Sequence, residues 1–256
     1  MKTNELLFEL SHSVRYEIMK ALAEGPLKLT KLGGLVGANN PEVSRHLDRL
    51  KKALLVDKDP SGSYYTTSFG SIIMSALPYF TFVTSLPEFF LEHDLSKIPQ
   101  EFMCRLGELE SCEIVQGTTV NFYRLDEMSK TSTDKILTVS NEFITKIEEK
   151  DLVEFGNALA SGFVLRYLFQ ENQLSDMNLM HLVDHCPAEK ECFRALPQVP
   201  LFCSICDDEV MISFLDAKGK ADFSVCFWSK DPGVMKWCED LLNHLWENGK
   251  PVSEIR

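Results

Sequence analysis

The first 103 residues of this 256-residue chain contain no cysteine, and all eight cysteines lie at or after Cys104. The pattern of a secretory signal, a basic start followed by an apolar core and a small-residue cleavage site, is also missing. Thiols in a chain without such a signal are typical of a reducing compartment. We therefore expect a cytoplasmic protein, and we exclude a cysteine metal site from the N-terminal part.

No continuous apolar run is long enough to span a membrane. The best candidate, residues 69–87, has nineteen residues without a charge, but it includes Pro78, Pro87 and several hydroxyl side chains. A bilayer-spanning helix needs about 20 predominantly apolar residues in succession. We therefore predict no membrane contact and interpret residues 69–87 as a buried helix or a dimer interface.

The common catalytic motifs are missing too. The chain has no Gly-x-Ser-x-Gly, no Walker-type phosphate loop and no Gly-x-Gly-x-x-Gly. None of its six histidines is followed two positions later by lysine, as phospholipase D chemistry requires. We predict a protein that binds rather than catalyses, without a cofactor. The alternative is a metal-dependent or hydrolytic enzyme with an accessory N-terminal module.

The net charge of −12 is distributed unevenly along the chain. Residues 1–75 contain ten Lys and Arg against eight Asp and Glu, whereas residues 76–256 contain 16 against 30. Only the N-terminal part could approach a phosphate backbone without net repulsion.

That N-terminal part has the order of short helices followed by a hairpin. Residues 5–24 carry apolar side chains at helical spacing, and Thr30 is the expected cap of a second short helix. Gly33 and Gly34 weaken this second helix, at roughly 1 kcal/mol for each glycine against alanine. The Pro-Ser-Gly-Ser cluster at 60–63 separates two short extended runs, which predicts a hairpin. This order predicts a winged helix-turn-helix.

Residues 39–55 predict the helix around which this domain is built. Asn40 is the expected cap, and Pro41 suits the first turn. The opposite face carries hydroxyl and guanidinium groups, which suit a DNA major groove. The alternative is an ordinary amphipathic helix with a solvated charged face. The predicted apolar stripe consists of Val43, Leu47, Leu50 and Leu54.

The predicted DNA contacts lie on this helix and in the hairpin. Arg45 is a candidate for a guanine edge and Glu42 for a cytosine amino group. Arg49 and Lys52 are candidates for phosphate, and His46 contacts either DNA or its own domain. The complete predicted set is Asn40, Glu42, Ser44, Arg45, His46, Arg49 and Lys52 on the helix, and Lys58, Ser61, Ser63 and Tyr64 in the hairpin.

The runs at 10–18, 22–27, 43–47 and 62–65 resemble the ArsR-type winged helix of prokaryotic transcription regulators. The most specific part is Val-Ser-Arg-His-Leu at 43–47. The resemblance implies a regulator that binds double-stranded DNA as a homodimer. It does not imply metal sensing, because the cysteines of the arsenic- and zinc-sensing members are missing here. A further alternative is a protein-interaction module whose winged helix no longer binds DNA.

The rest of the chain predicts a second, regulatory domain. Strands alternate with helices, which favours an α/β sandwich. Residues 89–117 resemble the regulatory domain of archaeal, mostly methanogen, two-domain ArsR-like regulators, and the body is similar to the phospholipase D-like fold without its catalytic motif. We predict an α+β protein whose regulatory domain senses an unknown signal, with a small-molecule effector as a candidate. The expected division is a winged helix-turn-helix at 1–72, connecting and dimerisation helices at 73–100, and a sensor domain at 101–256.

Cys203 and Cys206 form a Cys-x-x-Cys pair, a weak alternative metal site. Residues 200–206 predict a strand, however, and residues three apart on a strand point to opposite faces. We therefore favour buried core thiols. The candidates for effector binding are Phe122, Tyr123, Arg166, Phe227 and Trp228.

Overall fold

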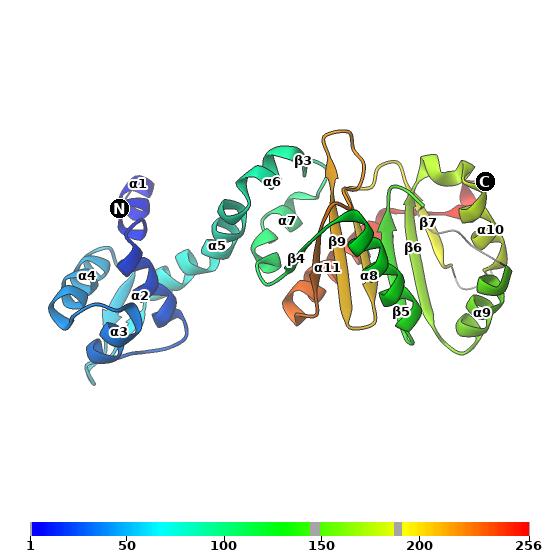
Figure 1. The fold of residues 1–256 in the computed structure, drawn as a ribbon. Helices are drawn as coiled ribbons and strands as arrows, with labels where there is room; N and C mark the ends of the chain where they lie inside the picture. The colour runs from blue at the N-terminus through cyan, green and yellow to red at the C-terminus, as the bar shows by residue number, and fades with distance from the viewer. Residues whose placement is uncertain (1, 144–148, 187–190, 256) are drawn as a thin grey trace. The chain divides into compact units, whose positions relative to one another are not determined.

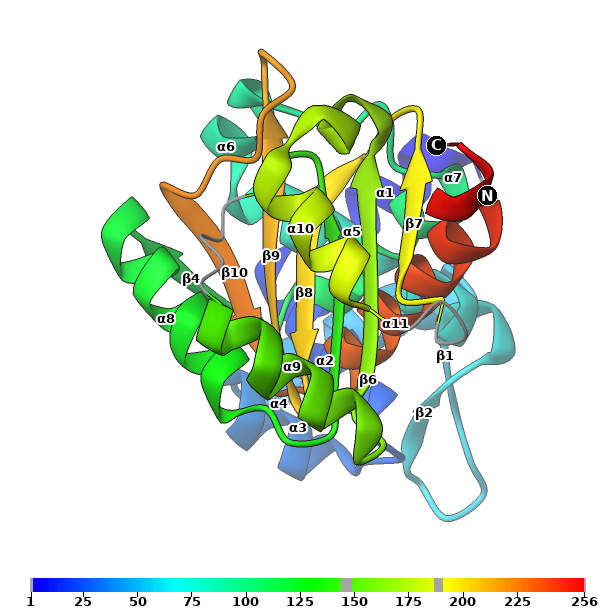
Figure 2. The same cartoon turned by 90° about the vertical axis from the view of Figure 1, so that its right-hand side faces the viewer.

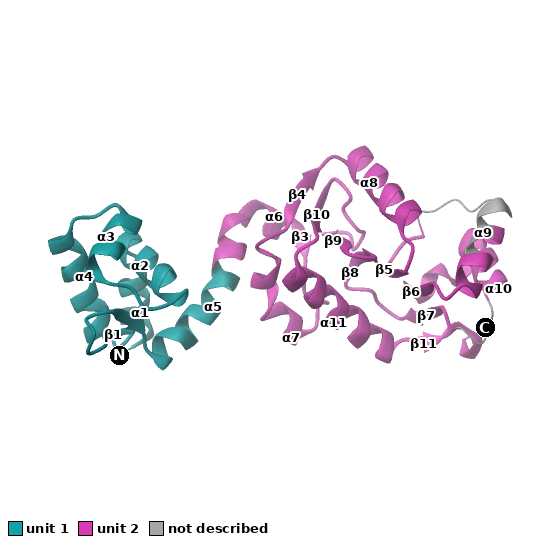
Figure 3. Cartoon of the chain, turned by 90° about the horizontal axis from the view of Figure 1, so that it is seen from below, with its two compact units in different colours: residues 1–80 teal, residues 81–256 magenta. Residues whose placement is uncertain are grey.

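The computed structural model describes residues 2–143, 149–186 and 191–255 (Figure 1). The chain forms two compact units, Met1–Phe80 and Thr81–Arg256 (Figure 3). The predicted connecting segment, residues 73–100, is divided between these units, and the three-part division stays a prediction. Among the helices of the described residues, none is both long and apolar enough to cross a bilayer.

Unit 1 has the predicted order of helices and hairpin. Its apolar core is formed by α2, α3, α4 and the hairpin, with the first half of α5 packed against it. The two strands pair antiparallel, with Val56 opposite Thr66. The elements are α1 (Thr3–Leu10), α2 (Ser13–Ala23), α3 (Leu29–Val36), α4 (Asn40–Lys52), β1 (Val56–Lys58), β2 (Tyr64–Thr66) and α5 (Ser68–Ser85), which ends in unit 2.

Three local predictions in unit 1 are wrong. The α4 cap is Asn39, whose side chain accepts a hydrogen bond from the Glu42 backbone N–H. The α3 helix starts one residue before Thr30, after Lys28, and no side chain caps it. Leu54 is 67% exposed because α4 ends at Lys52, and the fully buried Leu55 takes its place in the core.

Unit 2 contains a nine-stranded mixed sheet with the order β11-β7-β6-β5-β8-β9-β10-β4, and β3 pairs with β9. β5 and β6 are parallel, whereas β5 and β8 are antiparallel. The elements are α6 (Pro87–Glu92), β3 (His93–Asp94), α7 (Gln100–Met103), β4 (Glu113–Gln116), α8 (Thr118–Thr131), β5 (Lys135–Ser140), α9 (Glu149–Ala160), β6 (Val164–Gln170), α10 (Met177–His185), β7 (Phe193–Leu196), β8 (Leu201–Cys206), β9 (Glu209–Asp216), β10 (Val225–Ser229), α11 (Pro232–Asn248) and β11 (Lys250–Pro251).

Helices cover both faces of this sheet, which confirms the predicted layered α/β arrangement (Figure 2). α8, α9 and α10 lie on one face, where Met128 of α8 packs with Phe202 and Met211. α11 lies on the other face, and its buried Trp237 donates to the Phe102 carbonyl of α7. Asp231 caps α11, because its side chain accepts hydrogen bonds from the backbone N–H groups of Gly233 and Val234. The likeness to phospholipase D stays a prediction.

The end of α5 and the short helix α6 are fixed to the sheet by aromatic side chains. Phe82 is 3% exposed, and its ring centroid lies 5.9 Å from that of Phe227 on β10. Phe89 contacts Phe227 at 5.2 Å and Phe214 of β9 at 5.7 Å. The segment that leaves unit 1 therefore ends in packed contacts with strands β9 and β10 of unit 2's sheet.

The two cysteines of the Cys-x-x-Cys pair face opposite sides of β8. Cys206 packs with Met128 in the core under α8. Cys203 lies beside Cys238 of α11, whose thiol pKa is raised first by burial and then by Cys203. The two thiols therefore cannot bind one ion, and no group of three or more metal-binding side chains occurs among the described residues.

The effector-site candidates are divided between the two faces of the sheet: Phe122 and Trp228 lie beside Phe223, whereas Phe227 packs against Phe82. Phe227 and Trp228 are neighbours on β10 and therefore point to opposite faces of the sheet. The Arg124 guanidinium covers the Trp228 ring at 4.6 Å. Arg166 donates to Asn243 and covers Trp246 of α11. These residues do not define an effector site.

Candidate nucleic-acid interface

The turn between α3 and α4 is tight, and Gly33 and Gly37 allow this tight geometry. Gly37 adopts a left-handed conformation (φ 65°), and the Ala38 backbone N–H donates to the Gly33 carbonyl. A Cβ at Gly33 would lie 3.0 Å from the Ala38 carbonyl oxygen and 3.1 Å from Asn40 Oδ1. The glycine that weakens α3 therefore allows the close approach of the helix-turn-helix turn.

The apolar stripe of α4 orients the helix. Val43, Leu47 and Leu50 are each 0% exposed and contribute to the unit 1 core. Because residues at spacings of three and four share a helix face, the residues between them lie on other faces. Arg45 and Lys52 are exposed and lie on the face away from the core. Ser44 is half-buried beside this face.

Arg45 is the best placed of the predicted base contacts. Its only hydrogen bond among the described residues is a long one, 3.4 Å from Nε to the Pro41 carbonyl oxygen. No carboxylate within the described chain pairs with Arg45 or with Lys52. Their charges are therefore available to an anionic partner.

His46 faces its own domain rather than the outer face of α4. Its ring centroid lies 4.4 Å from that of His12, which precedes α2. Burial lowers the pKa of His46, and His12 lowers it further. Its Nδ1 is buried without a hydrogen-bond partner. A neutral imidazole packed between helices offers little attraction to DNA.

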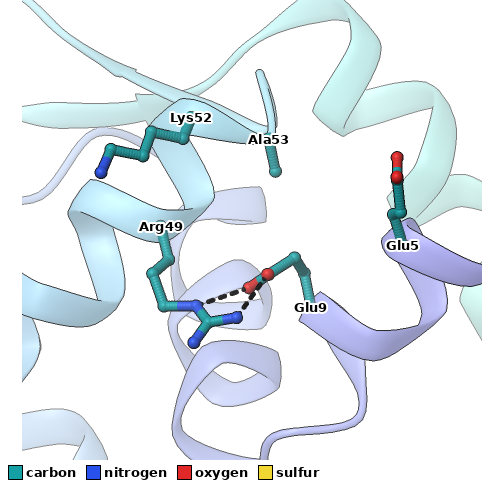
Figure 4. Close-up of a pocket in the computed structure, with 5 residues that line it drawn as sticks. All are labelled: Glu5, Glu9, Arg49, Lys52 and Ala53. Carbon is teal, nitrogen blue, oxygen red and sulfur yellow. Dashed lines mark hydrogen bonds and ion pairs between the residues drawn. The ribbon is translucent and has the colours of Figure 1, made fainter. Parts of the chain in front are cut away.

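Arg49 is held by a carboxylate of α1. Its Nη2 lies 2.6 Å from Glu9 Oε1 and its Nε 3.0 Å from Glu9 Oε2, a bidentate pair (Figure 4). The hydrogen bond from Arg49 lowers the pKa of Glu9 despite partial burial. The pair lines an open hollow of about 640 Å³ together with Glu5, Lys52 and Ala53.

Glu9 also holds a second, buried arginine. Arg15 of α2 is 3% exposed, and its Nε lies 3.1 Å from Glu9 Oε2. Its guanidinium also donates to the backbone carbonyls of Phe8 and Glu9. Burial lowers the pKa of Arg15, and Glu9 opposes this effect. One carboxylate therefore serves the two guanidinium groups of α2 and α4.

The hairpin turn is ordered by Asp59. Its Oδ1 accepts hydrogen bonds from the Ser61 hydroxyl at 2.7 Å and the Ser63 backbone N–H at 2.8 Å. Lys58 is exposed, with Nζ 5.1 Å from the Tyr64 ring centroid. Tyr64 itself is 9% exposed and belongs to the core. Lys58 and Ser61 are thus the outward-facing members of the predicted hairpin contacts.

Sequence reasoning missed Glu9 and Arg15. Glu9 lies forty positions before its partner Arg49, so no local spacing connects them. Arg15 is a charged residue on the α2 face that also carries the buried Ile18 and Leu22. A cation at a core position predicts a nearby carboxylate, but it does not say which one.

Residues 12–58 match the family model described as bacterial regulatory protein, arsR family. The methanogenesis regulatory protein FilR1 of Methanothrix harundinacea is 24% identical over 165 residues, which cover 63% of this chain and 37% of the relative. The chain is also similar to the archaeal chromatin protein TrmBL2, at 21% identity, 93% and 92% coverage of the two chains and a TM-score of 0.44. A phospholipase D family member, Nuc from Salmonella typhimurium, is 12% identical at 55% and 96% coverage, with a TM-score of 0.39.

The family match, at residues 12–58, falls on α2, α3, α4 and the first hairpin strand. These elements form the tight turn and the core-packed helix with a cationic outer face. Residues 12–58 therefore match the helix-turn-helix of the arsR family in sequence and form the helices and turn of such a motif.

Proposed function

We propose that this chain is a DNA-binding transcription regulator that reads its operator with the outer face of α4 and contacts phosphate with the hairpin. Arg45 contacts a base edge, Ser44 lies beside it, and Lys52, Lys58 and Ser61 contact the backbone. The observation that carries the proposal is the exposed Arg45 guanidinium, which has no carboxylate partner among the described residues. Asn40, Glu42 and Ser63 remain secondary candidates, whereas His46, Arg49 and Tyr64 make contacts within unit 1.

The regulator acts as a dimer on a two-fold symmetric site. Residues 1–75 have a net charge of only +2, so one copy offers few phosphate contacts. α5 carries no charge along Ser68–Ser85, and Ile72 on it is 67% exposed. An exposed apolar patch on a helix without charges favours an interface with a second copy.

Unit 2 senses a cytoplasmic signal, with a small molecule as the candidate effector. This part of the proposal is supported by the covalent connection between the units: α5 begins in unit 1, and its last turn carries the packed Phe82 of unit 2. A change in the sheet around Phe214 and Phe227 would reach α5 through these aromatic contacts. The aligned relative is longer than this chain, so its activity is not transferred here.

The decisive experiment compares specific and non-specific DNA binding. Operator fragments are first selected from genomic DNA with the intact protein, and affinities are then measured for an operator and a scrambled duplex. Arg45→Ala should reduce the discrimination by about 1–3 kcal/mol, roughly 5- to 150-fold. Lys20→Ala removes the same charge from the exposed side of α2 and should leave the discrimination unchanged. Equal discrimination by wild type and Arg45→Ala would remove Arg45 from the proposal.

The dimer has a separate test in light scattering. The wild type should have twice the chain mass of 29.1 kDa, and Ile72→Glu should shift it toward the monomer. Leu35→Glu is the control, because Leu35 is 60% exposed on α3 rather than on α5. A monomeric wild type, or a dimeric Ile72→Glu, would contradict this interface.

A further inference from the structure

Half of the cations on α4 are already neutralised inside unit 1. Lys51 pairs with Asp57 at 2.7 Å, and Arg49 pairs with both oxygens of Glu9. Both oxygens of the Glu9 carboxylate accept from Arg49, and Oε2 also forms an ion pair with Arg15. Of the four cations between Asn40 and Lys52, only Arg45 and Lys52 have no ion pair in the described part of the chain.

The geometry of the Glu9–Arg49 pair is that of a guanidinium bound to a phosphate. Arginine binds carboxylate and phosphate with the same two parallel N–H donors, so the two anions compete for one fork. Arg49 is 47% exposed along its side chain, whereas Glu9 is 17% exposed. The carboxylate is fixed in the domain, and the cation it holds lies at the surface.

Stacking holds Arg49 in the same place. Its guanidinium carbon lies 5.5 Å from the Phe8 ring centroid, and that of Arg15 lies 6.0 Å from the same ring. Phe8 and Glu9 are consecutive residues of α1. One short helix therefore supplies both the carboxylate and the aromatic surface that hold Arg49.

We propose that Glu9 is an internal substitute for DNA phosphate that keeps Arg49 off the DNA backbone, and so lowers sequence-independent binding. The inference rests on the proposed DNA-binding role of α4. A regulator gains specificity when phosphate contacts, which carry no sequence information, are few and base contacts remain. Glu9 thereby acts on specificity without touching a base.

The expected effect follows from counterion release. Each phosphate contact contributes about 0.9 to the slope of log affinity against log salt. Glu9→Gln frees one Arg49 in each protomer, so the slope should steepen by about 0.9 per protomer. At 0.1 M salt this corresponds to roughly eightfold tighter binding to a scrambled duplex per protomer.

The experiment measures the affinity of the full chain for a scrambled duplex across a salt series. Glu5→Gln is the matched control, because Glu5 lines the same hollow on α1 but has no bond to Arg49. It changes the net charge equally and should leave the slope at the wild-type value. We expect Glu9→Gln to fold, because Arg15 keeps its two backbone carbonyl acceptors. Circular dichroism of the variant checks this.

Arg49→Gln makes the test independent of how Glu9→Gln folds. Arg49 makes no phosphate contact in the wild type under this proposal, so Arg49→Gln should leave the salt slope unchanged. The double variant Glu9→Gln with Arg49→Gln should lose the gain of Glu9→Gln. A slope that falls by about 0.9 in Arg49→Gln would mean that Arg49 contacts phosphate despite Glu9, and would overturn the proposal.

The remaining outcomes separate this inference from the proposed function. A Glu9→Gln protein that binds no more tightly than Glu5→Gln overturns the role of Glu9 alone. Weaker binding by Glu9→Gln also overturns it, because Glu9 would then position Arg49 for DNA. A wild type that is not retained on any duplex at low salt would instead remove the proposed reading of DNA by α4.

Discussion

The two adjacent glycines of α3 should respond in opposite ways to the same substitution. Gly34 is exposed inside the helix, and an added Cβ would meet no atom within 4 Å. Gly33 is buried, and its Cβ would lie 3.0 Å from a backbone carbonyl oxygen in the turn to α4. A substitution at Gly34 therefore tests helix propensity alone, whereas the same substitution at Gly33 also tests the geometry of the turn.

Glycine in a helix interior costs about 1 kcal/mol relative to alanine. Gly34→Ala should therefore stabilise unit 1 by about 1 kcal/mol, which is a rise in its melting temperature of roughly 4–8 °C for a domain of this size. Gly33→Ala gains the same propensity but must move the Ala38 carbonyl. It should give no stabilisation or a net loss.

The assay must report on unit 1 alone. All three tryptophans, Trp228, Trp237 and Trp246, lie in unit 2, so their fluorescence reports the unfolding of unit 2 and not that of unit 1. Hydrogen exchange of α3 and α4 amides, measured by mass spectrometry, follows unit 1 directly, and 1 kcal/mol corresponds to an about fivefold smaller open population and equally slower exchange. Equal stabilisation by both substitutions would refute the argument from the turn, and no effect of Gly34→Ala would refute the argument from propensity.

Three further predictions concern other parts of the structure. Asn39→Ala should destabilise unit 1 by about 1 kcal/mol in the same exchange assay, whereas Asn40→Ala should cost less, because Asn39 is the residue that caps α4. Burial raises the pKa of Asp207, but hydrogen bonds from the backbone N–H groups of Thr133, Asp134 and Lys135 lower it, so that it ends below its ordinary value of about 3.9. The ionised Asp207 carboxylate therefore stabilises unit 2 above pH 4, and this stabilisation is lost as the pH falls further. Asp207→Asn should make the melting temperature of unit 2 fall less steeply on acidification, and an unchanged fall would contradict this. A thiol reagent should modify the exposed Cys104 in the folded protein and reach Cys238, 0% exposed with a raised thiol pKa, only on unfolding, and peptide mapping would reveal any early modification of Cys238.

The sequence by itself determined the local elements of this protein. The period of Val43, Leu47 and Leu50 predicted the core face of α4, and the turn residues at 60–63 predicted the hairpin. These features depend on periodicity, capping and turn propensity, which act over a few residues and are therefore readable along the chain.

The tertiary structure decided which charges face outward. Arg45 and Arg49 belong to one short helix and were both predicted to contact DNA, but of the two only Arg49 meets a carboxylate, forty residues away. Leu54 fits the apolar period, yet the helix ends before it, and Leu55 enters the core. Contacts between distant segments and the points where helices end depend on how the whole unit packs. Local spacing alone therefore could not predict them.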